Sequence, residues 1–165
     1  MRSFPNIFVT VGTTQFSGLI NALNSQEMAT ALEDVNCRKL TIQCGDQDVP
    51  ASKHPSSIER ITYNYLPSIL DDIRKADLVI SHAGAGTCID VLKHRKPLIV
   101  VVNDTLMHNH QIELAQQLGE EGVLVHCTPA TLPETLKHFD TAKLKDYKRG
   151  DPMNFVRELD KLMGF

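Results

Sequence analysis

The fold is decided by residues 77–90, which read DLVISHAGAGTCID. The apolar, β-branched run at 77–81 predicts a buried strand. Small residues follow it, and a helical pattern then begins at Thr87. Small side chains let a ligand approach the start of a helix, whose unpaired N–H groups and dipole favour an anion. The stretch therefore predicts a strand, a ligand-facing loop and a helix in succession.

The same pattern recurs along the chain. We predict strands at 6–11, 39–44, 58–63, 77–81, 98–102 and 123–125. We predict helices at 17–35, 66–75, 87–94 and 106–118. This alternation predicts a single Rossmann-like α/β domain, with a mostly parallel sheet flanked by helices. The run at 98–102 is the most apolar, so we expect it at the centre of the sheet.

Composition excludes several classes of protein. The 165 residues are 42% hydrophobic and 22% charged, which is typical of one globular domain with a real core. A net charge of −3 argues against a bulk electrostatic nucleic-acid binder. A membrane-spanning helix needs about 20 apolar residues, and no such run or signal peptide is recognisable, so we expect a cytoplasmic protein. The four cysteines form no C-x-x-C pair and predict reduced thiols.

The pattern divides the chain into a domain at 1–140 and a terminal helix at 151–165. A Lys- and Asp-rich stretch at 141–150 separates them. Asp151 and Pro152 are typical of a helix start. Five apolar residues then share one helical face: Phe155, Val156, Leu159, Leu162 and Met163. This face either packs on the chain's own domain or docks on a partner, and the sequence leaves both open.

Three loops follow predicted strands at the carboxyl edge of the sheet, where parallel α/β sheets bind ligands. They are the glycine loop that begins at Gly12, the loop at 82–90 and the polar loop at 103–111. The G-x-G at 84–86 lacks the third glycine of a dinucleotide fingerprint and does not follow the first strand. A carboxylate such as Asp90 can accept both hydroxyls of a ribose, or it can simply complement the helix dipole.

Together, the motifs FVTVGTT at 8–14, DLVISHAGAGT at 77–87 and PLIVVVNDTLMHNHQ at 97–111 resemble one family. It is the catalytic subunit of the two-component UDP-N-acetylglucosamine (UDP-GlcNAc) transferase of N-glycan assembly. That subunit is similar to the C-terminal, donor-binding half of the bacterial lipid II glucosaminyltransferase, in glycosyltransferase family 28. The resemblance covers roughly residues 6–127. It implies the donor-binding half of a GT-B glycosyltransferase.

The resemblance also implies a UDP-GlcNAc site whose residues fall into five groups. They are Gly12, Thr13 and Thr14 facing the diphosphate; Tyr65 and Leu66 reading the uracil edge; His82, Ala83, Gly84, Ala85, Gly86 and Thr87 beneath the diphosphate; Asp90 at the ribose; and Asn109, His110 and Gln111 at the GlcNAc hydroxyls. The bacterial relatives have Glu where this chain has Asp90.

The activity that the resemblance implies is inverting transfer of GlcNAc from UDP-GlcNAc to GlcNAc-pyrophosphoryl-dolichol, which adds the second sugar of the N-glycan precursor. No cofactor and no metal are expected, because helix-start N–H groups can stabilise the leaving diphosphate. The D-x-D at 46–48 lies in a polar loop, and we do not expect it to bind a metal. The general base is unassigned, with His82 as the fallback candidate.

One Rossmann-like half cannot hold both substrates of such an enzyme, so the resemblance implies a heterodimer. In the family, the acceptor-binding subunit is membrane-anchored and recruits the catalytic subunit to the cytosolic face of the endoplasmic reticulum. Two alternatives stay open. One is a regulatory module that binds a UDP-sugar without transferring it. The other is a small NAD-dependent oxidoreductase, suggested only by the G-x-G at 84–86.

Overall fold

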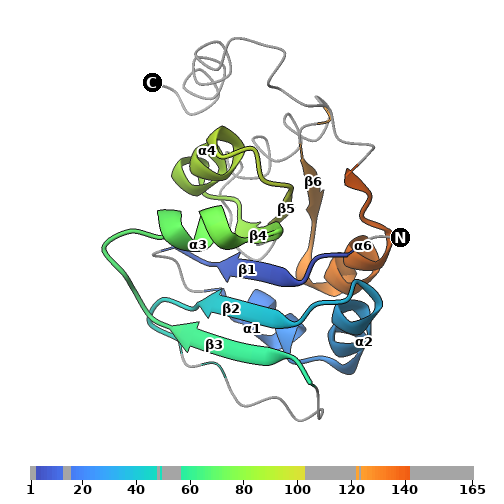
Figure 1. Cartoon of the computed structure of the whole chain (residues 1–165). Coiled ribbons are helices and arrows are strands. Elements are labelled where there is room, and N and C mark those ends of the chain that lie inside the picture. Colours follow the sequence, from blue (N-terminus) through green and yellow to red (C-terminus); the bar gives the residue numbers. More distant parts are fainter. Residues whose placement is uncertain are drawn as a thin grey trace.

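Six parallel strands form one sheet, in the order β3-β2-β1-β4-β5-β6. Figure 1 shows the computed structural model, which describes residues 3–12, 16–47, 49, 57–102, 122 and 124–141. The strands are β1 (Asn6–Thr10), β2 (Lys39–Gln43), β3 (Glu59–Tyr63), β4 (Leu78–His82), β5 (Leu98–Val101) and β6 (Val125–Cys127). The predicted α/β class and parallel sheet are confirmed.

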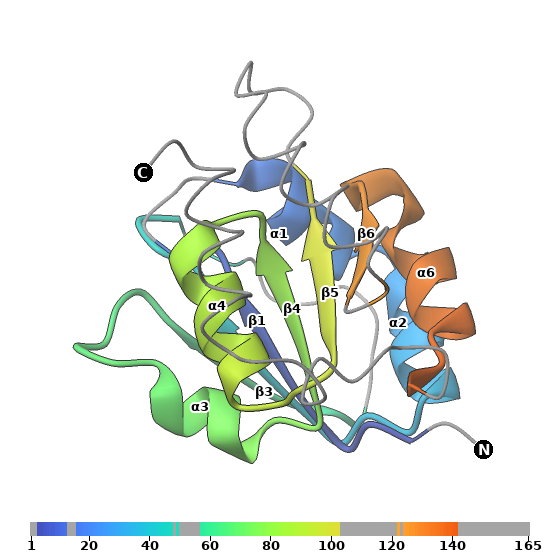
Figure 2. The ribbon, with the colours of Figure 1, turned by 90° about the horizontal axis from the view of Figure 1, so that it is seen from above.

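Helices cover both faces of the sheet (Figure 2). One face carries α1 (Ser17–Leu23), α2 (Gln26–Asp34), the 3-10 turn η1 (Pro129–Thr131) and α6 (Leu132–His138). The other face carries α3 (Leu70–Lys75) and α4 (Ala85–Lys93). None of the helices in the described ranges is long and apolar enough to cross a membrane.

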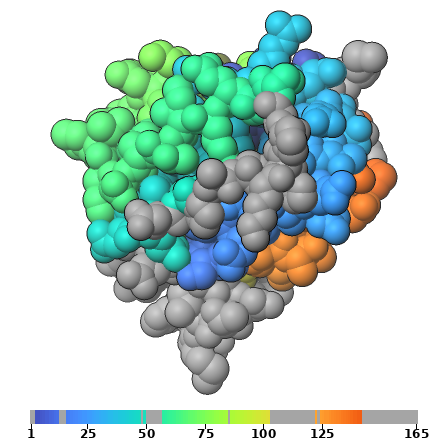
Figure 3. Space-filling model, turned by 90° about the horizontal axis from the view of Figure 1, so that it is seen from below, coloured from blue at the N-terminus to red at the C-terminus, as the bar shows by residue number. Residues whose placement is uncertain are grey.

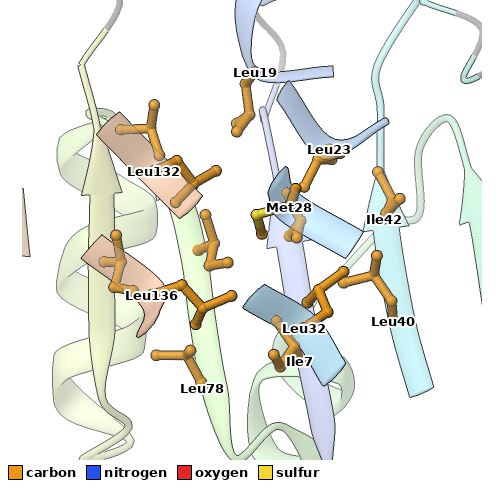
Figure 4. Close-up of a cluster of buried hydrophobic side chains, with 14 of the residues drawn as sticks. Ile7, Leu19, Leu23, Met28, Leu32, Leu40, Ile42, Leu78, Leu132 and Leu136 are labelled. Atoms are coloured by element: carbon orange, nitrogen blue, oxygen red, sulfur yellow. The ribbon is translucent and has the colours of Figure 1, made fainter. Parts of the chain in front are cut away.

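Successive residues of a strand point to opposite faces of the sheet and belong to two separate hydrophobic cores. In β1, Ile7 and Val9 pack against α1, α2 and α6, whereas Phe8 packs against α3 and α4. Figure 4 shows the first core, in which Met28 of α2 and Leu132 of α6 lie among the strand side chains. Because both faces are buried, the central strands read as continuous apolar runs, which is why sequence analysis could locate them.

The helix predicted over 17–35 is wrong, because it is broken at Ser25. The Ser25 hydroxyl donates to the Ala22 carbonyl at 2.8 Å and accepts from the Met28 N–H at 3.1 Å. These bonds replace helical ones, so α1 ends and α2 begins with Ser25 as its N-cap. Serine side chains compete with the backbone in this way, and a periodicity count does not detect it.

The prediction that 98–102 lies at the centre of the sheet is also wrong. β1 and β4 are central, and β5 lies between β4 and the edge strand β6. All four residues of β5 are buried. The strand is therefore apolar because both of its faces are covered, and not because it lies at the centre of the sheet. β6 begins at Val125, which pairs with Ile99, two residues later than predicted. The predictions at 106–118 and 151–165 lie outside the described residues.

The strand order creates a switch point between β1 and β4. From β1 the chain moves outward to β2 and β3, and it then returns to β4 and continues outward on the other side. Thr10 and Ser81 are paired at the carboxyl ends of these two strands. In doubly wound sheets, ligands bind at this position, where the two loops leave in opposite directions.

Candidate functional site at the carboxyl edge of β1 and β4

The imidazole of His82 packs between two glycines from different loops. Gly12 follows β1, and Gly84 follows β4. A Cβ at Gly12 would lie 2.7 Å from His82 Cε1, and a Cβ at Gly84 would lie 2.2 Å from His82 Nε2. Neither distance can accommodate a methyl group, so both loops need glycine here. The ring therefore joins two motifs that lie about 70 residues apart in the sequence.

Each of these glycines is also held by its backbone. Gly12 has a φ of +62°, in the left-handed region that glycine adopts without strain. The Gly84 N–H donates to the His82 carbonyl at 2.9 Å, and the Ser81 hydroxyl donates to the same carbonyl at 2.8 Å. The turn after β4 is thus set before α4 begins.

Burial keeps the His82 side chain neutral. The residue is 8% exposed, and its Nδ1 has no hydrogen-bond partner among the described residues. Burial lowers the pKa of His82 below its ordinary value of 6.5, and contact with the Thr10 backbone opposes this only in part. A neutral, enclosed ring between two loops suits a loop-shaping role better than that of an exposed base.

This lowered pKa predicts a pH dependence of stability. The unfolded chain binds a proton at His82 near pH 6.5, whereas the folded chain resists it. The stabilisation is present above pH 6.5 and is lost as the pH falls toward the folded pKa, at no more than about 1.4 kcal/mol per pH unit. We expect urea unfolding of His82→Gln to have a shallower pH slope than the wild type below this pH. Parallel slopes for the two proteins would contradict the assignment.

The start of α4 offers unpaired backbone donors. Gly84 is the N-cap, no side chain of the described residues caps the helix, and its first turn has no acidic residue. The N–H groups of Ala85, Gly86 and Thr87 belong to this first turn and have no carbonyl within the helix to bind. With the helix dipole, they favour an anion such as a diphosphate. Ala83 is buried under this turn, whereas Gly86 is exposed.

Asp90 lies one turn further along α4 and is half-buried. Its backbone carbonyl accepts from the His94 N–H at 3.2 Å and lies 2.7 Å from His94 Nδ1. Tyr65 and Leu66 follow β3, at the edge of the sheet, and are 45% and 51% exposed. Figure 3 shows the molecule from the side of β3, with the segment 57–75 (green) on one side and α1 and α2 (blue) on the other. Thr13, Thr14, Asn109, His110 and Gln111 lie outside the described residues.

Sequence analysis missed Gln43, the last residue of β2. It is 2% exposed and binds the Gly12 backbone through both ends of its carboxamide. The available signal was a long polar side chain within the largely apolar run LTIQC. Its partners lie 31 and 21 residues away, so no local pattern identifies them.

Metal-binding and nucleophilic chemistry find little support in the described part of the chain. It contains no group of three His, Cys, Asp or Glu side chains that could hold a metal ion. Asp46 is exposed, and Asp48 lies outside the described residues. All four cysteines are buried free thiols, and burial raises the pKa of Cys88 and of Cys127 to about 12. Such thiols stay protonated and unreactive at neutral pH.

A large cavity lies elsewhere, near the start of β1. It has a volume of about 1000 Å³ and is lined by Ser3 and Phe4 and by residues at the ends of α2 and α6. The ring of Phe4 packs against that of Phe139 beside it, with centroids 5.7 Å apart and planes tilted by 57°. This is the amino end of β1, away from the loops that follow β1 and β4. The cavity therefore belongs to no predicted site.

Comparisons with known proteins identify the family of this chain. Residues 6–163 match the model of the family described as the glycosyltransferase family 28 C-terminal domain. The chain is 47% identical to the UDP-N-acetylglucosamine transferase subunit ALG13 of Homo sapiens, over 74% of this chain and 11% of that protein. It is 30% identical to the protein of the same name in Candida glabrata, over 92% of this chain and 97% of that protein. The chain spans about a tenth of the two mammalian relatives that it matches.

Solved structures show the same fold. An NMR solution structure of ALG13 superposes with a TM-score of 0.72 at 29% identity, covering 95% of this chain and 96% of that one. MurG of Acinetobacter baumannii superposes with a TM-score of 0.66 at 21% identity, covering 95% of this chain but only 50% of that one. The fold is thus one Rossmann-like half of a GT-B glycosyltransferase. Because the family model matches nearly the whole length of the chain, the chain belongs to the glycosyltransferase family 28 C-terminal domain family.

Proposed function

We propose that this chain binds UDP-GlcNAc and transfers its GlcNAc to GlcNAc-pyrophosphoryl-dolichol, as the donor-binding half of a split inverting glycosyltransferase. One observation carries the proposal. Two glycine loops, at Gly12 and Gly84, pack on one buried histidine at the switch point of the sheet, beside the uncapped start of α4. The relatives named as UDP-N-acetylglucosamine transferase subunits support the donor and the reaction class.

The residues take distinct roles in this proposal. Backbone N–H groups at the start of α4 bind the diphosphate, and Asp90 holds the ribose hydroxyls. Tyr65 and Leu66 read the uracil edge. The remaining groups are Thr13 and Thr14 near the diphosphate and Asn109, His110 and Gln111 at the sugar. In the reaction, an acceptor hydroxyl attacks the anomeric carbon from the face opposite to UDP, which leaves with inversion. The helix-start N–H groups stabilise the negative charge that develops on the diphosphate.

The proposal places the general base on a second chain. His82 is enclosed between Gly12 and Gly84, so it supports the loops and does not reach an acceptor. This chain covers 50% of MurG, which supports a separate second half that supplies the acceptor site. The word "subunit" in the names of the relatives supports such a partner. We propose a membrane-anchored partner that holds this chain at the cytosolic face of the endoplasmic reticulum.

The test is transfer of radiolabelled GlcNAc from UDP-GlcNAc to a lipid-linked GlcNAc pyrophosphate. The purified chain is assayed alone and with the membrane-anchored partner. We expect activity only with the partner. Activity of the chain alone would refute the split enzyme and return His82 to consideration as the base. Binding of UDP-GlcNAc without transfer in both assays would favour the regulatory module. Displacement of the donor by NAD but not by UDP would favour an oxidoreductase.

A further inference from the structure

The carboxamide of Gln43 is fully hydrogen-bonded inside the protein. Its Oε1 accepts from the Gly12 N–H at 2.9 Å and from the Thr10 hydroxyl. Its Nε2 donates to the Gly12 carbonyl at 2.9 Å and to the Asn64 carbonyl at 2.7 Å. Reversing the amide would turn its oxygen toward two carbonyl oxygens, so the network allows one orientation. A buried amide with every partner in place holds its neighbours in one arrangement.

Gln43 binds both polar groups of the Gly12 backbone, just as a neighbouring strand would. The Gly12 N–H and C=O both point to the same side chain. These two hydrogen bonds fix the left-handed conformation of Gly12, at a φ of +62°. They thereby set the position of the Gly12 Cα against the His82 ring. Because glycine has the largest conformational freedom of any residue, this constraint has to come from outside the loop.

The same side chain also fixes the segment that follows β3. The Asn64 carbonyl accepts from Gln43, and the Asn64 side chain donates to the Gly45 carbonyl at 2.6 Å. Asn64 directly precedes Tyr65 and Leu66, which the proposed function places at the uracil edge. One carboxamide therefore ties the start of the base-reading segment to the glycine loop at the diphosphate.

We infer that Gln43 is a positioning residue of the nucleotide site, which couples the placement of Tyr65 and Leu66 to that of Gly12. This inference rests on the proposed function for its ligand. It does not make Gln43 a catalytic residue, because the side chain acts through backbone groups of other residues. A buried amide that only stabilised the fold would leave UDP affinity unchanged in protein that remains folded.

The variant Gln43→Glu distinguishes these roles, because its effect depends on pH. A carboxylate can still accept from the Gly12 N–H and from Thr10, but its second oxygen repels the carbonyls of Gly12 and Asn64 and so loosens both segments. Once protonated, the carboxyl can donate to one of those carbonyls. Burial raises the pKa of such a group above its usual value, so the change falls in an accessible range. Gln43→Glu should therefore bind poorly at high pH and recover as the pH falls.

Gln47→Glu is a matched control from the same segment. The Gln47 Oε1 accepts from the Phe16 N–H at 2.7 Å, and its Nε2 donates to the Ser17 hydroxyl at 2.8 Å. A carboxylate at this position is tolerated, because the Ser17 hydroxyl can turn and donate. Thr10→Val is a milder second variant, which removes the hydroxyl that donates to Gln43 and also accepts from the Gly12 N–H at 3.2 Å.

The experiment measures UDP affinity by calorimetry from about pH 8 to about pH 5, as the ratio of each variant to wild type. The ratio cancels the titration of UDP itself. At the upper end we expect Gln43→Glu to bind about tenfold more weakly or worse, and Thr10→Val several-fold more weakly. The Gln43→Glu ratio should approach one as the pH falls. The Gln47→Glu ratio should stay within about twofold of one over the whole pH range. Wild-type affinity of folded Gln43→Glu at high pH would overturn the inference.

Amide hydrogen exchange provides a readout that needs no ligand. Exchange at Gly12 and at Gly45, whose N–H donates to the Asn64 carbonyl at 3.2 Å, should accelerate together in Gln43→Glu at high pH and slow again at low pH. Unchanged protection of Gly12 would overturn the positioning role. If the wild type bound no UDP at all, the proposed function would fall, and the exchange rates would still decide whether Gln43 sets these two segments.

Discussion

Gly84→Ala should lower the free energy of unfolding by about 1–3 kcal/mol and abolish measurable UDP binding. The backbone of Gly84, at φ −91° and ψ 125°, suits alanine, so the cost is steric and not conformational. The new methyl would lie 2.2 Å from His82 Nε2 and 2.8 Å from His82 Cε1. The ring cannot move away, because Gly12 closes its other side. Urea unfolding and a UDP titration measure the two effects.

Gly86→Ala is the informative counterpart, two residues further along the same loop and helix. Gly86 lies in α4, and no heavy atom of the described residues is within 4 Å of a Cβ placed there. Alanine favours helix over glycine by about 1 kcal/mol at most in this setting, so stability should stay level or rise. UDP affinity should nevertheless fall, because the methyl would occupy the approach to the helix start. Equal UDP affinity of Gly86→Ala and wild type would remove Gly86 from the proposed site.

Gly12→Ala should be at least as damaging, because two costs add. Alanine in the left-handed region costs about 1–2 kcal/mol, and Gly12 has a φ of +62°. Its Cβ would also lie 2.7 Å from His82 Cε1, which adds about 1–3 kcal/mol of overpacking. The free energy of unfolding, from urea denaturation, should fall by about 2–5 kcal/mol in total.

A double-mutant cycle separates the two costs of Gly12→Ala. In a His82→Ala background the ring is gone, so Gly12→Ala should retain only its backbone cost. A coupling energy near zero between positions 12 and 82 would show that the ring does not constrain Gly12. The same cycle applied to Gly84 should leave almost no residual cost, because its backbone already suits alanine.

Strands were predictable because burial on both faces leaves a continuous apolar run. The predicted starts of β1, β2 and β5 match the observed ones. The order of the strands was less accessible, since β5 is as apolar as a central strand without being one. α6 was not predicted at all, although Pro133 near its first turn and the Thr128–Thr131 capping pair before it are recognisable start signals.

The candidate site, too, has residues that the sequence indicates and residues that only the folded structure identifies. The glycines that follow β1 and β4 are visible in the sequence, where small residues indicate room for a ligand. The structure adds a second reason for Gly12 and Gly84, which is the His82 ring itself. For Gly86 no such internal reason exists among the described residues. Gln43 escaped prediction because its meaning depends on Gly12 and Asn64, which come together only in the folded sheet.

The pairing of β1 with β4 has a consequence for synthesis. Ile7 pairs with Leu78, and the Asn6 N–H binds the Asp77 carboxylate across 71 residues. During translation, β1 can pair with β2 early, yet its other edge stays bare until β4 leaves the ribosome. Long-range parallel pairing of this kind is slow to form. His82 arrives with that last central strand, so the packing of its ring against Gly12 and the middle of the sheet are completed by the same event. Nucleotide capture would then report on finished folding and not on a partly made chain.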